Sequence, residues 1–239
     1  MRVSLVDYGA GNLRSVANAM AAIGIEPHLA GAAPDLTDTT HLVLPGVGSF
    51  GDCMAQLASR GLLAPIREWV LAGKPYLGIC LGYQILLDAS EESPGVAGLG
   101  LVRGSVRRFA QTPGLKIPHI GWNSAVPLRP DDGNWQGLGS EPYFYFVHSY
   151  FPVPEDPSVI AASTGYGQDV FAAAIELPNL LACQFHPEKS QDAGLRQRMG
   201  ASGRAAAEAN YSRDAIARRL DWFLRSTLAS PAAQPSARA

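Results

Sequence analysis

The chain has 239 residues, of which 47% are hydrophobic and 17% charged, a composition that can bury one sizeable core and is typical of one large α/β domain. Its formal net charge of -2 supplies no basic surface for a phosphate backbone, which argues against a nucleic-acid partner. No apolar run approaches the roughly 20 residues that span a bilayer, and the first residues meet an acid and glycines too early for a signal peptide. Three widely spaced cysteines favour a reducing compartment, so we expect a cytoplasmic protein with no membrane association.

Strands and helices alternate in the first part of the chain. Residues 2–6 form an apolar run that favours a buried strand, and after a glycine-rich turn residues 13–23 carry apolar side chains at helical spacing. Residues 41–44 predict a second strand, stopped by the sequence PGVG. A helical segment then precedes a third strand, which ends at Ile79 and continues into a helix. This order predicts an α/β fold with an open, mostly parallel sheet and helices on both faces.

The middle of the chain changes character, because apolar segments follow one another with little helix between them. Such a series predicts a mixed or antiparallel extension of the sheet. The expected strands are 101–109, 120–125, 143–147, 159–163, 171–176 and 181–185.

The sequence predicts that the chain divides into three regions. A main domain covers residues 1–200, a helical extension covers 201–229, and a disordered tail rich in Ala, Pro and Ser covers 230–239. Ser212 fits an N-cap, and apolar residues recur on one face of the helix that would follow. We expect this stripe to pack on the main domain. It consists of Ile216, Leu220, Phe223 and Leu224.

A cysteine stands where a strand becomes a helix, in the stretch Gly78-Ile79-Cys80-Leu81-Gly82. A sharp turn there would strain the backbone of Cys80, and the glycines two positions away on each side remove Cβ atoms that would clash. The sulfur would then lie at the carboxyl edge of the sheet, beside a helix N-terminus that favours a thiolate and can face an oxyanion. These five residues alone fit a structural cysteine as well as a nucleophile.

A base for this cysteine is found in the stretch Gln-Phe-His-Pro-Glu at residues 184–188. Pro187 favours an extended conformation at His186, and residues two apart in an extended segment point the same way, so His186 and Glu188 can meet. They follow an apolar strand, on the same sheet edge as Cys80 if the strands run parallel. The tripeptide alone would more often mark a surface turn. Together with the cysteine turn it predicts a catalytic triad of Cys80, His186 and Glu188.

Longer motifs extend this pattern over residues 1–194. GICLGYQIL and QFHPEKS resemble the class I, triad-type glutamine amidotransferases. VDYGAGNLRSV, LPGVGSFGDCM, PHIGWN and YFVHSY resemble, within that class, the glutaminase subunits of imidazole glycerol phosphate synthase. The resemblance implies that Cys80 attacks the side-chain amide of L-glutamine, giving a γ-glutamyl thioester and ammonia, while His186 moves the proton and Glu188 orients His186. Water then releases glutamate.

The same resemblance implies the rest of the glutamine site. It assigns an oxyanion hole to backbone N–H groups at Val47 and Leu81, and substrate contacts to Gly48, Gln84, Ser149 and Tyr150. A plain turn at PGVG and a solvent-facing Gln84 are the alternatives that the residues alone leave open. No cofactor is expected, because the glycines at 9 and 11 lack the third glycine of a dinucleotide fingerprint. The five histidines show no metal-ligand spacing, so no metal is expected either.

Ammonia is mostly protonated at neutral pH, so its transfer to a second substrate needs a dry route. The resemblance implies a heterodimer with a cyclase subunit of (βα)8-barrel fold, which receives the ammonia and makes imidazole glycerol phosphate and an aminoimidazole carboxamide ribotide in histidine biosynthesis. It places the interface at Asn12, His119, Trp122, Asn123, Tyr145 and Lys189. For Trp122 and Tyr145, core aromatic packing is the alternative.

Two other functions would use the same triad. A paralogous glutaminase subunit that feeds ammonia to a sugar-modifying synthase would keep every motif, and only its partner would distinguish it. A Cys-His hydrolase that cleaves γ-glutamyl or peptide bonds would not need PHIGWN or HPEKS, so these two motifs argue against it.

Overall fold

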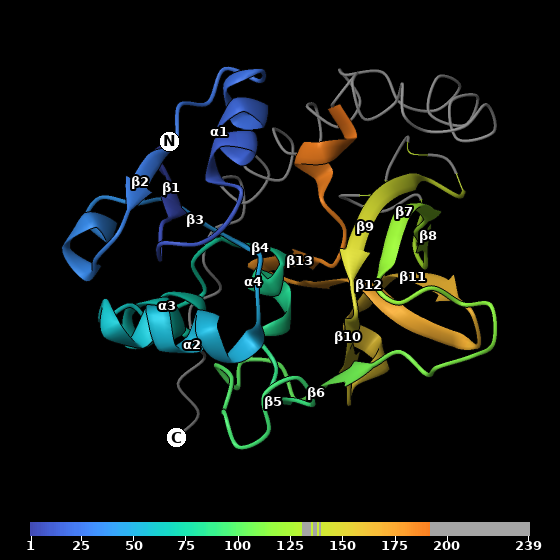
Figure 1. The fold of residues 1–239 in the computed structure, drawn as a ribbon. Helices are drawn as coiled ribbons and strands as arrows, with labels where there is room; N and C mark the ends of the chain where they lie inside the picture. The colour runs from blue at the N-terminus through green and yellow to red at the C-terminus, as the bar shows by residue number, and fades with distance from the viewer. Residues whose placement is uncertain (131–134, 136–137, 139, 192–239) are drawn as a thin grey trace, which may run out of the picture.

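A computed structural model describes residues 1–130, 135, 138 and 140–191 of the chain. Its centre is an eight-stranded sheet in the order β2-β1-β3-β4-β13-β12-β11-β8 (Figure 1). The first five strands of this order run parallel, and each of the last three is antiparallel to its neighbours. The predicted mostly parallel sheet with an antiparallel extension is therefore confirmed. The bounds are β1 Val3–Val6, β2 His28–Ala30, β3 His41–Gly46, β4 Tyr76–Cys80, β8 Val126–Pro127, β11 Ile160–Tyr166, β12 Asp169–Leu177 and β13 Leu180–Cys183.

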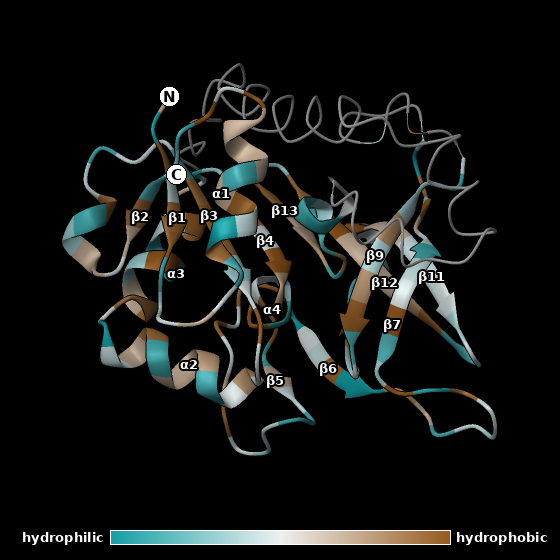
Figure 2. Ribbon diagram, turned by 45° about the horizontal axis from the view of Figure 1, so that its top comes forward, coloured by the Kyte–Doolittle hydropathy of each residue, from teal (hydrophilic) through white to brown (hydrophobic). Residues whose placement is uncertain are grey.

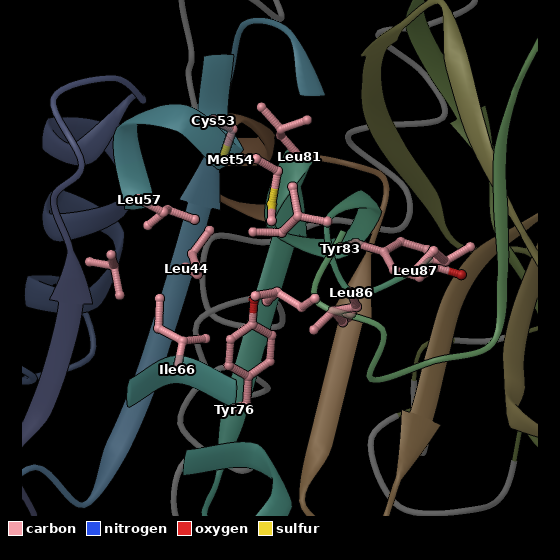
Figure 3. Packing of buried hydrophobic residues seen from close by; sticks show 14 of the residues in the cluster. Leu44, Cys53, Met54, Leu57, Ile66, Tyr76, Leu81, Tyr83, Leu86 and Leu87 are labelled. Atoms are coloured by element: carbon pink, nitrogen blue, oxygen red, sulfur yellow. The ribbon is translucent and has the colours of Figure 1, made fainter. Parts of the chain in front are cut away.

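Helices cover both faces of the parallel part, as the alternation of elements predicts (Figure 1). On one face α1 (Leu13–Ala21) buries Val16 and Met20. On the other face lie α2 (Phe50–Ser59) and α3 (Leu63–Leu71). Figure 3 shows the second core between these helices and the sheet, formed by Leu44 of β3, Tyr76 of β4, Leu57 of α2, Ile66 of α3 and their neighbours.

The central strands are buried along their whole length and mostly apolar because both of their faces are covered. All residues of β1, β3 and β4 are buried, and Figure 2 shows these strands predominantly in the colours of hydrophobic residues. The edge strand β2 is not predicted by the sequence. It has only three residues and Leu29 in it is exposed, so it shows neither a continuous apolar run nor a readable alternation. No helix among the described residues is long and apolar enough to cross a membrane.

Two smaller sheets stand beside the antiparallel edge. One has the order β10-β6-β5, and in the other β7 pairs with β9. These strands account for the segments expected at 101–109, 120–125 and 143–147. The strand expected at 181–185 is β13 and ends two residues earlier, so the residues that follow leave the sheet and can turn toward β4. The bounds are β5 Ala89–Ser90, β6 Gly104–Arg108, β7 His119–Ser124, β9 Tyr143–His148 and β10 Tyr150–Pro154. The short helices η1 (Ala33–Leu36) and η3 (Pro157–Val159) lie in connecting segments.

Two buried histidines join β7 to β9. The carbonyl of Tyr150 can only accept, so His148 Nδ1, at 2.8 Å, donates to it. His148 Nε2 is then the acceptor for His119 Nδ1 at 3.3 Å, and His119 Nε2 accepts from Asn123 Nδ2 at 3.3 Å. Both rings are therefore neutral. Burial lowers the pKa of His119 to about 4 and that of His148 to about 3.

Acidification is expected to destabilise the fold through this pair. Unfolded, both histidines bind a proton near pH 6.5, whereas folded they stay neutral until about pH 4 and 3. The unfolded chain binds more protons in that window, so stability falls from pH 6.5 downward, by up to about 1.4 kcal/mol per pH unit for each ring. Urea unfolding compared at about pH 6 and about pH 5 measures this slope, because the raised pKa of His186, about 10, contributes a slope of opposite sign mainly above pH 6.5. Replacing both rings by Gln should flatten it, whereas His28→Gln, in the edge strand, should not.

The predicted helical extension over 201–229, with Ser212 and its apolar stripe, and the predicted tail over 230–239 lie outside the described residues. The boundary expected at residue 200 lies outside them too, since the described part of the chain ends at residue 191.

Candidate active site

Cys80 is the last residue of β4 and has a backbone conformation that few side chains adopt. Its φ is +54° and its ψ is -106°, and α4 (Leu81–Gln84) begins at the next residue. A non-glycine residue in this region costs on the order of 1–3 kcal/mol and persists only where its surroundings impose it. The helix expected after the cysteine is present but has a single turn. The strain is concentrated at the residue that would act as the nucleophile.

The glycines on either side of Cys80 let the chain turn this sharply. A Cβ at Gly82 would lie 1.8 Å from the carbonyl oxygen of Leu44 in β3, and one at Gly78 would lie 2.6 Å from the carbonyl oxygen of Gly82. The clash predicted at both positions is confirmed. The hydroxyl of Tyr76 donates to the same Gly82 carbonyl at 2.8 Å and ties the start of β4 to α4. The turn is therefore held rigidly against the sheet.

The imidazole of His186 and the carboxylate of Glu188 meet directly after β13. His186 Nδ1 lies 2.8 Å from Glu188 Oε1, and both side chains are buried. The backbone N–H of His186 donates to the carbonyl of Tyr145 at 2.9 Å, and Glu188 lies in η4 (Pro187–Gln191). Since β13 pairs in parallel with β4, the two strands end at the same sheet edge. The fold thus brings His186 and Glu188 to Cys80.

The electrostatics of this group fit an ion pair. Burial alone would lower the pKa of His186, but the charge of Cys80, a hydrogen bond with Cys80 and the bond to Glu188 together raise it to about 10. With Nδ1 engaged by Glu188, it is Nε2 that faces the sulfur. The imidazole can therefore take the thiol proton and hold it as an imidazolium.

A cavity of about 260 Å³ opens beside Cys80 and His186. All six residues expected to form the oxyanion hole and the substrate contacts line it: Val47, Gly48, Leu81, Gln84, Ser149 and Tyr150. They come from the loop after β3, from α4 and from the junction of β9 and β10, where Tyr150 is the first residue of β10. The sequence motifs that are far apart along the chain therefore converge on one pocket.

Further residues around this pocket were not predicted. Glu92 lines it, and its Oε2 accepts from the backbone N–H of Phe50 at 2.7 Å, at the N-terminus of α2. Gln184 is fully buried, and its Nε2 lies 3.5 Å from Cys80 Sγ. Glu92 lies in a loop with no motif around it. Gln184, by contrast, belongs to the QFHPEKS motif, and its position beside the triad could have identified it.

Five of the six residues expected at a partner interface are partly exposed, and the sixth, His119, is buried. Trp122 and Tyr145 pair across β7 and β9 with ring centres 6.3 Å apart, and Lys189 Nζ lies 5.5 Å from the centre of the Tyr145 ring. Lys189 also lines the cavity. Asn12, at the start of α1, and Asn123, which donates to the carbonyl of Gly165 at 2.9 Å, are partly exposed as well.

His119 differs from the others because it is only 3% exposed. Its ring stacks against Tyr166 and Phe146, with centres 3.9 and 4.9 Å away. Its side chain therefore lies in the interior, not on a surface that a partner would touch.

An α/β sheet with a strained cysteine turn and a His-Glu pair at one edge defines a triad-type amidohydrolase site. The family model described as Glutamine amidotransferase class-I matches residues 4–197, and the chain belongs to that family.

Within the class, the chain belongs with the HisH subunits. It is 47% identical over 194 residues to imidazole glycerol phosphate synthase subunit HisH of Gloeothece citriformis. The matched region covers 81% of this chain and 92% of the relative. A HisH subunit of Thermosynechococcus vestitus is 47% identical over 195 residues with the same coverage. Imidazole glycerol phosphate synthase hisHF of Emericella nidulans is 46% identical over 204 residues, covering 81% of this chain but 36% of the relative.

Solved structures share the fold at low sequence identity. A crystal structure of a glutamine amidotransferase superposes with a TM-score of 0.63 at 20% identity, covering 87% of this chain and 100% of that one. The structure of PurLQS from Thermotoga maritima gives a TM-score of 0.61 at 24% identity, covering 87% of this chain and 96% of that one. These two likenesses support the fold alone.

Proposed function

We propose that this chain is the glutaminase subunit of an imidazole glycerol phosphate synthase, which hydrolyses L-glutamine to glutamate and ammonia and passes the ammonia to a cyclase subunit. The observation that carries the proposal is that Cys80 and His186 line one cavity while Glu188 holds the other side of the His186 ring. The similarity to HisH subunits over most of the chain supports the choice of pathway, histidine biosynthesis.

The first half of the reaction makes the thioester. His186 Nε2 takes the Cys80 proton, and the thiolate attacks the side-chain amide carbon of glutamine. The oxygen that becomes negative is held by backbone N–H groups at Val47 and Leu81. When the tetrahedral intermediate collapses, the carbon–nitrogen bond breaks and the imidazolium gives its proton to the leaving nitrogen, which departs as ammonia.

The second half regenerates the enzyme. Neutral His186 takes a proton from a water molecule, which attacks the thioester carbonyl, and the carbon–sulfur bond breaks to release glutamate. Glu188 keeps the Nδ1 proton of His186 in place throughout, so that Nε2 remains the atom that exchanges protons with sulfur, nitrogen and water. No cofactor or metal is needed for these steps.

Glu92 is proposed to bind the α-ammonium group of glutamine. Its carboxylate lines the cavity and is fixed by the N-terminus of α2. Glu92→Gln keeps an acceptor for Phe50 but removes the charge. We expect KM for glutamine to rise about tenfold or more with kcat little changed, because this contact forms equally in ground and transition states. Glu91→Gln is the control, since Glu91 is exposed and its carboxylate accepts from the backbone N–H of Arg108 at 2.8 Å. An unchanged KM in Glu92→Gln would exclude this role.

The partner is proposed to be a cyclase subunit of (βα)8-barrel fold, forming a heterodimer in the cytoplasm. The Trp122, Tyr145 and Lys189 cluster borders the glutamine pocket, so a partner bound over it would receive ammonia without its release into water. Asn12 and Asn123 would extend this contact, while His119 supports β7 from inside.

Reconstitution with a purified barrel cyclase tests the function. Glutamine should replace ammonium salt as the nitrogen donor for imidazole glycerol phosphate, with one glutamate formed per product. Glutamine hydrolysis without glutamine-dependent product would instead favour a paralogous subunit that serves a sugar-modifying synthase. Hydrolysis of γ-glutamyl peptides at rates similar to glutamine would favour a hydrolase.

A further inference from the structure

Gln184 has no role in the mechanism above, although its side chain touches the nucleophile. It is the first residue after β13 and is fully buried. Its backbone N–H donates to the carbonyl of Ala173 in β12 at 2.8 Å, which fixes the position of its Cα. Its side-chain amide then lies between Cys80 and Gln84.

The hydrogen-bond network fixes which end of this amide faces the sulfur. The carbonyl oxygen of Tyr150 can only accept, so the group of Gln84 that lies 3.0 Å from it is the NH2. The same NH2 lies 2.9 Å from the Gln184 side chain, which must therefore present its oxygen there. The remaining end of the Gln184 amide, its NH2, lies 3.5 Å from Cys80 Sγ, a usual distance for a hydrogen bond to sulfur.

A donor facing the sulfur discriminates between the two forms of Cys80. A thiolate accepts a strong, charge-assisted hydrogen bond, whereas a thiol accepts a weak one. Within the described part of the chain this NH2 group bonds no other acceptor, and its burial removes it from water. The site therefore supplies a second hydrogen-bond donor to the sulfur besides the imidazole of His186.

We propose that Gln184 is a positioning residue that holds the Cys80 sulfur as a thiolate and ties it to Gln84 in the glutamine pocket. This inference rests on the proposed function only in taking Cys80 as the nucleophile. A variant that tests this role must leave in place the other titratable groups that lie near the sulfur or line the cavity. They are Tyr8, Glu92, His148, Cys183, His186, Glu188 and Lys189.

Alkylation of Cys80 by iodoacetamide as a function of pH tests the inference without requiring activity. Cys80 lines the cavity, whereas Cys53 and Cys183 do not. Burial also raises the pKa of Cys53 to about 12 and that of Cys183 well above its usual range, so these two thiols should react slowly. Gln184→Met keeps the length and removes the donor. Its midpoint pH of alkylation should rise by about one unit or more, the shift that corresponds to a tenfold loss of thiolate preference.

Kinetics of the full chain with its partner give the second readout. The glutaminase kcat of Gln184→Met should fall about tenfold with a smaller change in KM, as expected for loss of one hydrogen bond to a charged sulfur. The ammonia-dependent reaction should not change. Gln56→Leu is the control, because Gln56 is exposed on α2. Gln184→Leu serves as a second variant if the Met variant does not fold.

An unchanged alkylation midpoint in a folded variant would overturn the inference, whatever its activity. If the wild-type complex did not hydrolyse glutamine at all, the proposed function would fail instead, while the alkylation profiles would still decide the role of Gln184.

Discussion

Replacing Cys80 by alanine is expected to abolish glutamine hydrolysis and to leave the ammonia-dependent reaction of the complex intact. Only the amide-cleaving half needs a nucleophile, because added ammonium salt supplies the same ammonia to the partner. Loss of a covalent nucleophile costs on the order of 10⁶ in rate, or about 8 kcal/mol of barrier. Glutamate release and product formation from ammonium salt, measured on the same preparation, check the two halves separately.

Cys53→Ala is the matched control for this variant. Cys53 is equally buried and lies in α2, but it does not line the cavity. It should retain glutaminase turnover with a small loss of stability. Substantial glutamine hydrolysis by Cys80→Ala would exclude Cys80 as the nucleophile, and loss of the ammonia-dependent reaction would show that the substitution damages the fold or the complex.

The cysteine turn could be predicted because its determinants are local. Gly78, Cys80 and Gly82 lie within five residues, and the atoms that exclude a Cβ belong to the adjoining turn and the neighbouring strand. The His186–Glu188 contact is also local, since two residues separate the partners. What the sequence could not supply by itself is the distance between these two motifs. That distance follows from the parallel pairing of β13 with β4. The order of elements along the chain does not fix which strand pairs with β4.

The side chains that were missed reach the site through contacts distant in sequence. Glu92 is oriented by the first residue of α2, so no spacing rule applies to it. Gln184 belongs to the QFHPEKS motif, but its contact with Gln84 joins residues 100 positions apart. The burial of His119 does not follow from strand alternation alone. His119 is buried and Ile120 is 58% exposed, but the other four residues of β7 are all partly exposed. The predicted interface took His119, Trp122 and Asn123 together, although His119 packs inside among Phe146 and Tyr166.

The two halves of the proposed oxyanion hole differ in how firmly they are held. Leu81 follows the strained turn and is packed in the core. Val47 lies in the loop after β3 and is 38% exposed, and a Cβ at Gly48, where φ is +100°, would meet no atom within 4 Å. The loop therefore has room to change conformation, while α4 does not. The Lys189 side chain, which lines the same cavity, reaches Tyr145 in the proposed interface.

We therefore expect the isolated chain to be a poor glutaminase that its partner activates. If the Val47 amide is placed correctly only when the partner with its acceptor is bound, the free chain lacks one oxyanion donor and is slower by roughly 10² to 10³. Glutamate release by the free chain, by the complex and by the complex with an acceptor analogue measures this difference. Gly48→Ala, which forces a side chain into positive φ in this loop, should reduce the activated rate. Gly24→Ala imposes a comparable strain, since Gly24 has φ +76° and equally open surroundings after α1, and it should leave both rates as they are. Equal rates in all three states of the wild-type chain would show that the oxyanion hole is complete without a partner.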